Sequence, residues 1–231
     1  MTGKLIALEG LDGSGKGTQT SLLCEALAGR GIRLRHISFP DYAEPSSALV
    51  KMYLNGEFGK DPNTVNAYAA SSFFAVDRYA SYMRYWREEY ENGSLIVADR
   101  YTTSNLVFQL SKVPKAERES FIDWLQDYEY GKLGLPRPDL TLYLDMPQEV
   151  SQKLLTQRYQ GDEKKKDIHE KNAAYLSECR ESALYAGKRL HWKVIRCANG
   201  TGENAEPRTV EEIHREIIKV ISEELPFYVS I

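Results

Sequence analysis

The residues best suited to chemistry form a glycine-rich run near the start of the sequence, GLDGSGKGTQ, from Gly10 to Gln19. Gly10, Gly15 and Lys16 fit the pattern Gly-x4-Gly-Lys, which a random chain of this length and composition would match roughly 0.07 times. Glycines allow the backbone to turn several N–H groups toward an anion, and the lysine adds a full positive charge. The run therefore predicts a loop that binds a polyphosphate.

One position in this loop departs from the common pattern. Gly17 stands where a serine or threonine usually follows the lysine, and Thr18 comes next. A direct hydroxyl contact to Mg²⁺ from position 17 is therefore not expected. We predict that Mg²⁺ is bound mostly through water, which this ion retains readily, with Thr18 as a candidate ligand.

Three further clusters carry groups that could hold a second substrate: DRYTTSN from Asp99, FFAVDR ending at Arg78, and FPDY ending at Tyr42. Asp99 could order water bound to Mg²⁺, and Arg100 could hold a phosphate through two parallel hydrogen bonds. Phe74 and Arg78 are four residues apart, so they share a helix face on which they could stack on a base and bond a carbonyl. Taken singly, each cluster also fits a structural role.

These residues must be positioned by alternating strands and helices. Short apolar runs predict five strands, at 4–9, 33–39, 94–99, 140–145 and 193–196. Helical spacing of apolar residues predicts helices at 15–29, 63–90, 102–110, 114–130, 147–158, 168–190 and 209–224. Because strands separated by helices pair in parallel, we predict an α/β fold with a doubly wound, five-stranded parallel sheet. Such sheets bind ligands at the carboxyl ends of their strands.

Composition sets the class of protein. The 231 residues are 42% hydrophobic and 27% charged, with a net charge of −3, which is typical of a soluble domain and argues against binding to nucleic acid through bulk charge. We expect one domain, residues 1–231, without a signal peptide or a membrane span. Cys24, Cys179 and Cys197 lack metal-binding spacing, so we expect free thiols in a reducing cytoplasm.

In combination these motifs resemble one family. GLDGSGKGTQ, FPDY, FFAVDR, DRYTTSN and GLPRPDL occur in the order and spacing of thymidylate kinases, which are P-loop nucleoside monophosphate kinases. The resemblance runs over nearly the whole chain and implies transfer of the γ-phosphoryl group of ATP to dTMP, with Mg²⁺ as cofactor. It also implies that the chain is a homodimer, for which the helix at 63–90 is a plausible interface.

The resemblance implies roles for individual residues. The ATP phosphates would lie on Gly10, Gly13, Ser14, Gly15, Lys16, Gly17 and Thr18. The groups expected around dTMP are Asp12 near the sugar 3′-hydroxyl, Phe74 and Arg78 on thymine, Ser104 and Asn105 near the base, Phe108 against the deoxyribose, Arg100 on the phosphate, and Phe39, Pro40 and Tyr42 of FPDY.

A lid over residues 158–170 is also implied. Some relatives carry an arginine within the P-loop, where this chain has Gly13, and others supply it from the lid, where this chain has Arg158. DIHE, at 167–170, resembles a motif that follows the lid. The polar stretch 199–208 lies where the family contacts adenine, and its contacts are not assigned.

The predicted mechanism is electrostatic. The second pKa of a phosphate monoester is near ~6, so dTMP is already a nucleophile at neutral pH and no general base is required. Catalysis would consist of holding the transferred group in line. The residues that would do so are Lys16, Arg100, Arg158 and, through Mg²⁺-bound water, Asp99.

Two alternatives stay open from sequence. One is another nucleotide or deoxynucleoside kinase, since GKGTQ also resembles adenylate kinase and Glu9 could be a base for a hydroxyl acceptor. The other is a nucleotide-dependent switch, although the chain lacks the Asn-Lys-x-Asp guanine motif.

Overall fold

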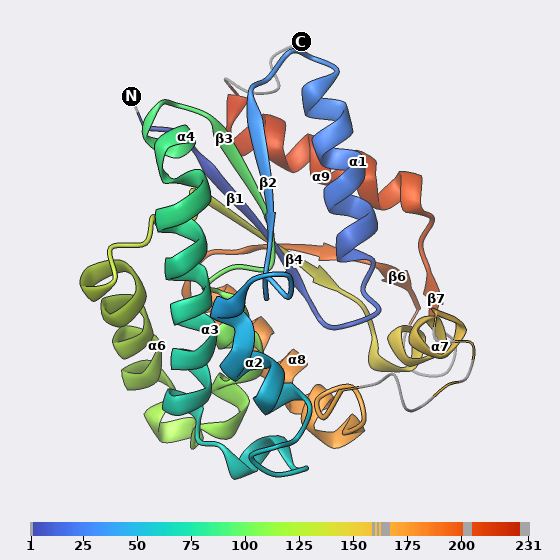
Figure 1. The fold of residues 1–231 in the computed structure, drawn as a ribbon. Helices are drawn as coiled ribbons and strands as arrows, with labels where there is room; N and C mark the ends of the chain where they lie inside the picture. The colour runs from blue at the N-terminus through green and yellow to red at the C-terminus, as the bar shows by residue number, and fades with distance from the viewer. Residues whose placement is uncertain (1, 159, 161, 163–166, 201–204, 227–231) are drawn as a thin grey trace.

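The computed structural model describes residues 2–158, 160, 162, 167–200 and 205–226. Its centre is a five-stranded parallel sheet in the order β2-β3-β1-β4-β5 (Figure 1). The strands are β1 (Leu5–Gly10), β2 (Leu34–Ser38), β3 (Leu95–Asp99), β4 (Leu140–Asp145) and β5 (Lys193–Arg196). The predicted doubly wound, five-stranded sheet is therefore confirmed, with each predicted strand within about one residue of its observed ends.

Helices connect the strands. The α-helices are α1 (Lys16–Ala28), α2 (Ala48–Leu54), α3 (Ala67–Ser81), α4 (Arg87–Glu91), α5 (Ser104–Phe108), α6 (Arg118–Gln126), α7 (Gln148–Arg158), α8 (Ala173–Arg189) and α9 (Val210–Glu224). Two π-helical segments, Tyr82–Trp86 and Asp127–Lys132, follow α3 and α6 directly. Short 3₁₀ turns lie at Pro45–Ser47, Pro62–Thr64, Leu110–Lys112 and Lys115–Glu117.

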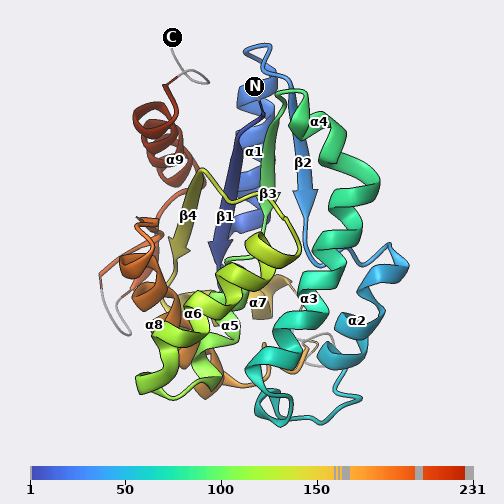
Figure 2. The same ribbon diagram turned by 90° about the vertical axis from the view of Figure 1, so that its left-hand side faces the viewer.

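The two faces of the sheet are covered by different helices. On β1, Ile6 and Leu8 pack with α1 and α9, whereas Leu5 and Ala7 point to the opposite face and pack with Trp86. Because successive side chains of a strand point to opposite faces, a strand buried on both sides reads as the continuous apolar run seen here. Figure 2 shows α1 and α9 on one side of the sheet and the α3–α4 run on the other.

The sheet places the candidate site residues at one edge. Asp99, the last residue of β3, is in register with Leu8 of β1, and the glycine-rich loop follows β1 at once. Because β1 and β3 are neighbours, Asp99 and Arg100 lie beside the loop. In Figure 2 the strands run toward α2, α5 and α7 at this edge.

The predicted helix at 63–90 differs in its start and its regularity. The helix begins at Ala67, because the Asn66 side chain accepts a hydrogen bond from the N–H of Ala69 at 2.9 Å and caps it. Its continuation passes through the π-helical turn, within which the Trp86 side chain is fully buried. Side-chain spacing alone does not reveal a π-turn, since the apolar pattern continues through it.

Several other helices also differ from the predicted ranges. Helix α2 was not predicted, and α8 begins at Ala173 rather than 168 because Asn172 caps it by accepting from the N–H of Tyr175. The predicted helices at 102–110 and 114–130 are each broken into shorter helical pieces. A small antiparallel hairpin, β6 (Ala198–Asn199) with β7 (Glu206–Pro207), lies largely within the polar stretch 199–208. Over the described residues, no helix is both long and apolar enough to cross a membrane.

Candidate active site

The glycine-rich loop has the backbone that a phosphate site needs. Gly13 and Gly15 have φ angles of 77° and 85°, in the left-handed region that favours glycine. The Lys16 ammonium donates to the Leu11 carbonyl oxygen at 2.9 Å, within the loop itself. Burial, together with the nearby charge of Arg100, lowers the pKa of Lys16 to about 8. The loop therefore gathers N–H groups and a buried cation at the start of α1.

The position of Gly13 explains one departure from the family pattern. A Cβ atom on Gly13 would lie 2.6 Å from the carbonyl oxygen of Ser151 in α7. A side chain there is excluded unless α7 moves, so this chain cannot use an arginine within the loop. Arg158 is the last residue of α7, and its side chain, like residues 163–166 of the expected lid, lies outside the described part.

Arg100 and Asp12 meet where two clefts join. Arg100 donates to Asp12 at 2.6 Å and to the Gly10 carbonyl oxygen at 3.1 Å, and its guanidinium lies 4.9 Å from the centre of the Phe108 ring. Burial opposes ionisation of Asp12, but the charges of Arg100 and Lys16 prevail and lower its pKa to about 2. Both residues line a large cleft that contains residues 13–19 of the loop, here called the phosphate cleft, and a smaller pocket beside it. A cation therefore stands between two candidate substrate sites.

Asp99 faces the first turn of α1. One of its carboxylate oxygens lies 3.6 Å from where a Cβ atom on Gly17 would be, and both residues line the phosphate cleft with Thr18. Among the described residues, no group of three His, Cys, Asp or Glu side chains could hold a metal. One carboxylate beside a phosphate loop suits Mg²⁺, which binds through few protein ligands, phosphate oxygens and water.

The smaller pocket is lined mostly by residues that the sequence singled out. Phe74 lies edge-on to Tyr53, with ring centres 6.2 Å apart. Asp77 holds the FPDY segment against α3, since its carboxylate accepts from the N–H of Asp41 at 2.9 Å. The lining residues are Asp12, Phe39, Pro40, Tyr42, Leu54, Phe74, Arg78, Arg100, Ser104, Asn105, Phe108, Gln109, Asp167 and His169.

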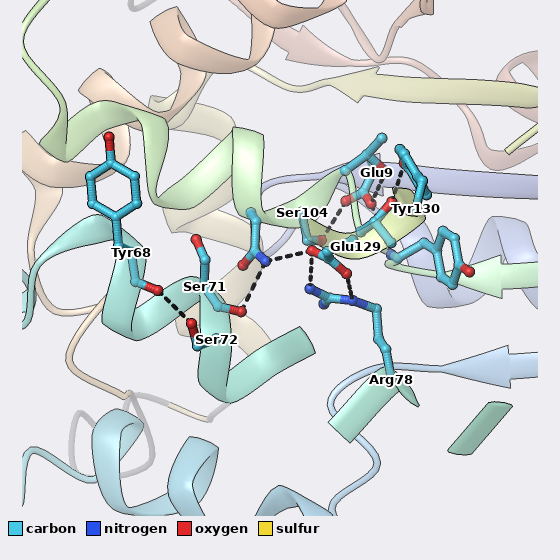
Figure 3. Close-up of polar contacts among 12 residues, drawn as sticks. Glu9, Tyr68, Ser71, Ser72, Arg78, Ser104, Glu129 and Tyr130 are labelled. Atoms are coloured by element: carbon cyan, nitrogen blue, oxygen red, sulfur yellow. Dashed lines mark hydrogen bonds and ion pairs between the residues drawn. The ribbon is translucent and has the colours of Figure 1, made fainter. Parts of the chain in front are cut away.

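Arg78 lies deeper than the sequence indicated. It is 1% exposed, and its Nε and Nη2 donate to the two carboxylate oxygens of Glu129 at 2.8 and 2.6 Å (Figure 3). Asn105 donates to the same carboxylate at 2.9 Å. Glu129, which sequence reasoning missed, is 51 residues from Arg78, and no local pattern links them.

Glu9 is fully buried and forms a support under the site. Its carboxylate accepts from the N–H of Tyr101 at 2.9 Å and from the hydroxyls of Thr103 and Ser104, each at 2.6 Å. Burial raises its pKa, against the opposing charge of Arg100. Glu9 lines neither cleft. It therefore holds the loop after β3 in place and is poorly placed to act as a base.

The end of the expected lid, at Asp167 and His169, lines the pocket. The His169 ring stacks on Phe108 with ring centres 5.4 Å apart, and its Nε2 lies 2.8 Å from the Tyr53 hydroxyl. Burial and nearby Lys112 lower the pKa of His169 to about 3, so the ring is neutral. Burial, then the charge of Asp12, raise the pKa of Asp167 to about 7.

Gln109 is another residue that the sequence analysis missed. It is 0% exposed and lines the pocket, and neither side-chain amide atom forms a well-aligned hydrogen bond with a described residue. The Tyr53 hydroxyl lies near it but is already engaged with His169 and Lys112. The sequence did contain a signal for this position, because Gln109 follows Asn105 by four residues and therefore shares its helix face.

This fold and site define a P-loop nucleotide kinase: a doubly wound parallel sheet with a phosphate loop after β1 and a second substrate pocket beside it. A thymidylate kinase family profile matches residues 8–207. The chain therefore belongs to the thymidylate kinase family, whose members phosphorylate dTMP with ATP as donor.

Individual relatives agree with this assignment. The chain is 30% identical over 184 residues to the thymidylate kinase of Mycobacterium tuberculosis, covering 79% of this chain and 84% of that one. It is 26% identical over 226 residues to that of Danio rerio, covering 96% and 91%. The solved thymidylate kinase of Candida albicans superposes with a TM-score of 0.68 at 24% identity, covering 96% of this chain and 92% of that one, which supports the fold.

Proposed function

We propose that the two joined clefts bind ATP and dTMP, and that Arg100 acts on the phosphate passed between them. The observation that carries this proposal is that Asp12 and Arg100 line both the phosphate cleft and the aromatic-lined pocket. Direct transfer requires donor and acceptor phosphates to be in contact and in line. A cation shared by both clefts is where that contact would be stabilised.

The proposed roles follow from placement. Lys16 and the loop N–H groups bind the ATP phosphates, because their dipoles and charge converge on the start of α1. Arg100 binds the phosphate of dTMP and Phe74 stacks on its base. Asp99 would hold water on Mg²⁺, and the bound ion supplies charge neutralisation at the transferred group. Residues 158–170 form the proposed lid, which includes Arg158.

The structure disfavours a hydroxyl acceptor. A deoxynucleoside kinase needs a base beside the P-loop strand, and Glu9 was the candidate. Its carboxylate instead accepts three hydrogen bonds from residues 101–104 and lines neither cleft. A phosphate acceptor needs no base, which agrees with a site that offers cations.

The test is a coupled assay of ADP formation with Mg·ATP and dTMP, dUMP, dCMP, AMP or thymidine as acceptor. We expect dTMP to be phosphorylated with the highest kcat/KM and thymidine to be inert. Preferred phosphorylation of thymidine or AMP would refute the assignment of the pocket. ATP binding with slow hydrolysis and no transfer to any acceptor would favour the switch.

We also propose that the protein is a cytoplasmic homodimer. Val76, Tyr79 and Met83 form an exposed stripe at helical spacing on α3 and its continuation, each 39–44% exposed. Such a stripe is covered at low cost by a second copy. The three cysteines are free thiols, as in a reducing compartment. Analytical ultracentrifugation of the wild type and of Tyr79→Glu tests the dimer. The wild type should sediment as a dimer, and the charge introduced by Tyr79→Glu should dissociate it. A monomeric wild type would refute the proposed dimer.

A further inference from the structure

The polar groups behind the base pocket form one connected network. Glu129 is 0% exposed although its neighbour Asp127 is exposed, and it lies in the π-helical segment Asp127–Lys132. Its carboxylate accepts three hydrogen bonds, two from Arg78 and one from Asn105. A group that only accepts is what an ionised carboxylate offers. Figure 3 shows Glu129 between Arg78 and the helix that carries Ser104.

The pair with Glu129 leaves one edge of the Arg78 guanidinium available to the pocket. A guanidinium has five N–H groups, and Glu129 takes the Nε–H and one on Nη2. This bidentate pairing fixes the plane of the guanidinium. The Nη1 group takes no part in the pair, and Arg78 lines the pocket. Arg78 therefore offers the pocket a donor whose direction Glu129 sets.

The side-chain amide of Asn105 is also held in one orientation. Its Nδ2 donates to the Ser71 carbonyl oxygen at 3.2 Å and to Glu129 at 2.9 Å. A carbonyl and a carboxylate can only accept, so the nitrogen must face them and the amide cannot turn over. The amide oxygen accepts from no described side chain, and Asn105 lines the pocket. Asn105 therefore offers an acceptor.

From this geometry we propose that Glu129 is a positioning residue that sets the hydrogen-bond polarity of the base pocket. A pyrimidine with a 4-keto group presents an acceptor at O4 beside a donor at N3–H, whereas a 4-amino pyrimidine presents the reverse. A donor from Arg78 beside an acceptor from Asn105 matches the first pattern and opposes the second. Glu129 thus favours dTMP and dUMP over dCMP without touching the base. This inference rests on the proposed function.

The decisive variant is Glu129→Gln. Oε1 of Glu129 accepts from both Arg78 and Asn105, whereas Oε2 accepts only from the Nε of Arg78. A glutamine therefore keeps its oxygen at the Oε1 position and turns its NH₂ group toward the Nε–H of Arg78, so two donors face each other. The guanidinium loses its bidentate partner and with it the fixed direction of the donor that it offers to the pocket. The ratio of kcat/KM for dTMP to that for dCMP should fall about 10- to 100-fold, mainly through a higher KM for dTMP. The exposed carboxylate variant Glu119→Gln should leave this ratio unchanged.

A comparison of acceptors distinguishes lost direction of Arg78 from mere structural damage. Damage to the pocket lowers kcat/KM for dTMP and dCMP together and leaves their ratio unchanged, whereas a misdirected guanidinium lowers kcat/KM for dTMP and dUMP alone. A second variant, Glu129→Asp, keeps the charge but shortens the side chain by one methylene, and we expect its ratio to fall about threefold, less than in Glu129→Gln. A Glu129→Gln variant that melts like the wild type and keeps the wild-type ratio overturns the proposal.

If Glu129→Gln does not fold, Glu129→Asp carries the test: a lower ratio of kcat/KM for dTMP to that for dCMP supports the proposal, and an unchanged ratio overturns it. Failure of the proposed function looks different, because the wild type itself would then phosphorylate neither dTMP nor dUMP.

Discussion

Replacing Arg100 with methionine isolates the cation at the junction of the two clefts. The change removes the contacts of the guanidinium with Asp12 at 2.6 Å and with the Gly10 carbonyl oxygen at 3.1 Å. It keeps an unbranched apolar stem beside Phe108. Arg100 has a φ of 67°, and methionine, also unbranched at Cβ, suffers the same backbone strain there. The variant therefore loses charge and hydrogen bonds with little change in backbone preference.

The expected loss of activity is large. A cation that stabilises a transferring phosphoryl group is worth 10³–10⁵ in rate in comparable sites. Arg100 is one of several positive groups, with Lys16 also in the cleft, so we take the lower end. The kcat/KM for dTMP should fall about 10³-fold, which corresponds to about 4 kcal/mol. The KM for ATP should change little.

The expected loss of stability is small and depends on pH. The folded-state pKa of Asp12 is about 2, below its usual 3.8, which corresponds to at most about 2.4 kcal/mol. The Asp12 side chain is 27% exposed and Lys16 shares the effect, so we expect the variant to lose about 1 kcal/mol at neutral pH. A depressed carboxyl pKa stabilises above pH 3.8 and ceases to do so as pH falls toward 2. The difference should therefore vanish in acid.

Steady-state kinetics and thermal melts between pH 2 and 8 check both expectations. Arg189→Met is the matched control, since Arg189 pairs with Glu119 on the surface and both are about half exposed. A 1 kcal/mol loss lowers the Tm by about 2–4 °C. A variant that keeps more than a tenth of the wild-type kcat/KM would refute the role of Arg100. A large loss of stability at neutral pH would refute the account of the ion pair.

Three other changes test separate parts of the site. Gly13→Arg should lower the free energy of unfolding by about 2–3 kcal/mol in urea melts, because its Cβ meets the Ser151 carbonyl oxygen at 2.6 Å; unchanged stability would contradict the packing of α7. Gln109→Leu should raise the KM for dTMP about tenfold and leave that for ATP unchanged; equal effects on both would contradict a base contact. Asp167→Asn should remove a decline in stability between about pH 4 and 7, because a raised carboxyl pKa destabilises the fold as pH rises toward 7; parallel stability profiles would contradict it.

Local sequence patterns predicted the framework well. The three central strands, β1, β3 and β4, are short, mostly apolar runs, as expected for strands that are buried on both faces. The phosphate loop was predictable because its glycines and lysine are contiguous. The beginnings of α3 and α8 were misplaced because Asn66 and Asn172 cap them within polar stretches, where apolar spacing carries no information.

The parts of the pocket that sequence reasoning missed depend on long-range contacts. Glu129 lies within an aromatic, apparently regular helical pattern, and only the π-helical segment turns it inward. Its partner Arg78 is on another helix. The placement of His169 over Phe108 likewise joins residues 61 positions apart. Such pairings follow from packing of whole elements, which one sequence does not specify.

The two arginines at the site divide its work through the way they are paired. Arg78 is fully buried and its charge is matched by Glu129 through two hydrogen bonds, so the base pocket reads hydrogen-bond direction with little net charge. Arg100 is held by Asp12 through a single hydrogen bond, so no carboxylate matches its guanidinium along a whole edge. A neutral base gains from fixed geometry, whereas a phosphate dianion gains from unmatched cations. Removing Glu129 should therefore change which base is accepted, and removing Arg100 should weaken every acceptor nucleotide alike.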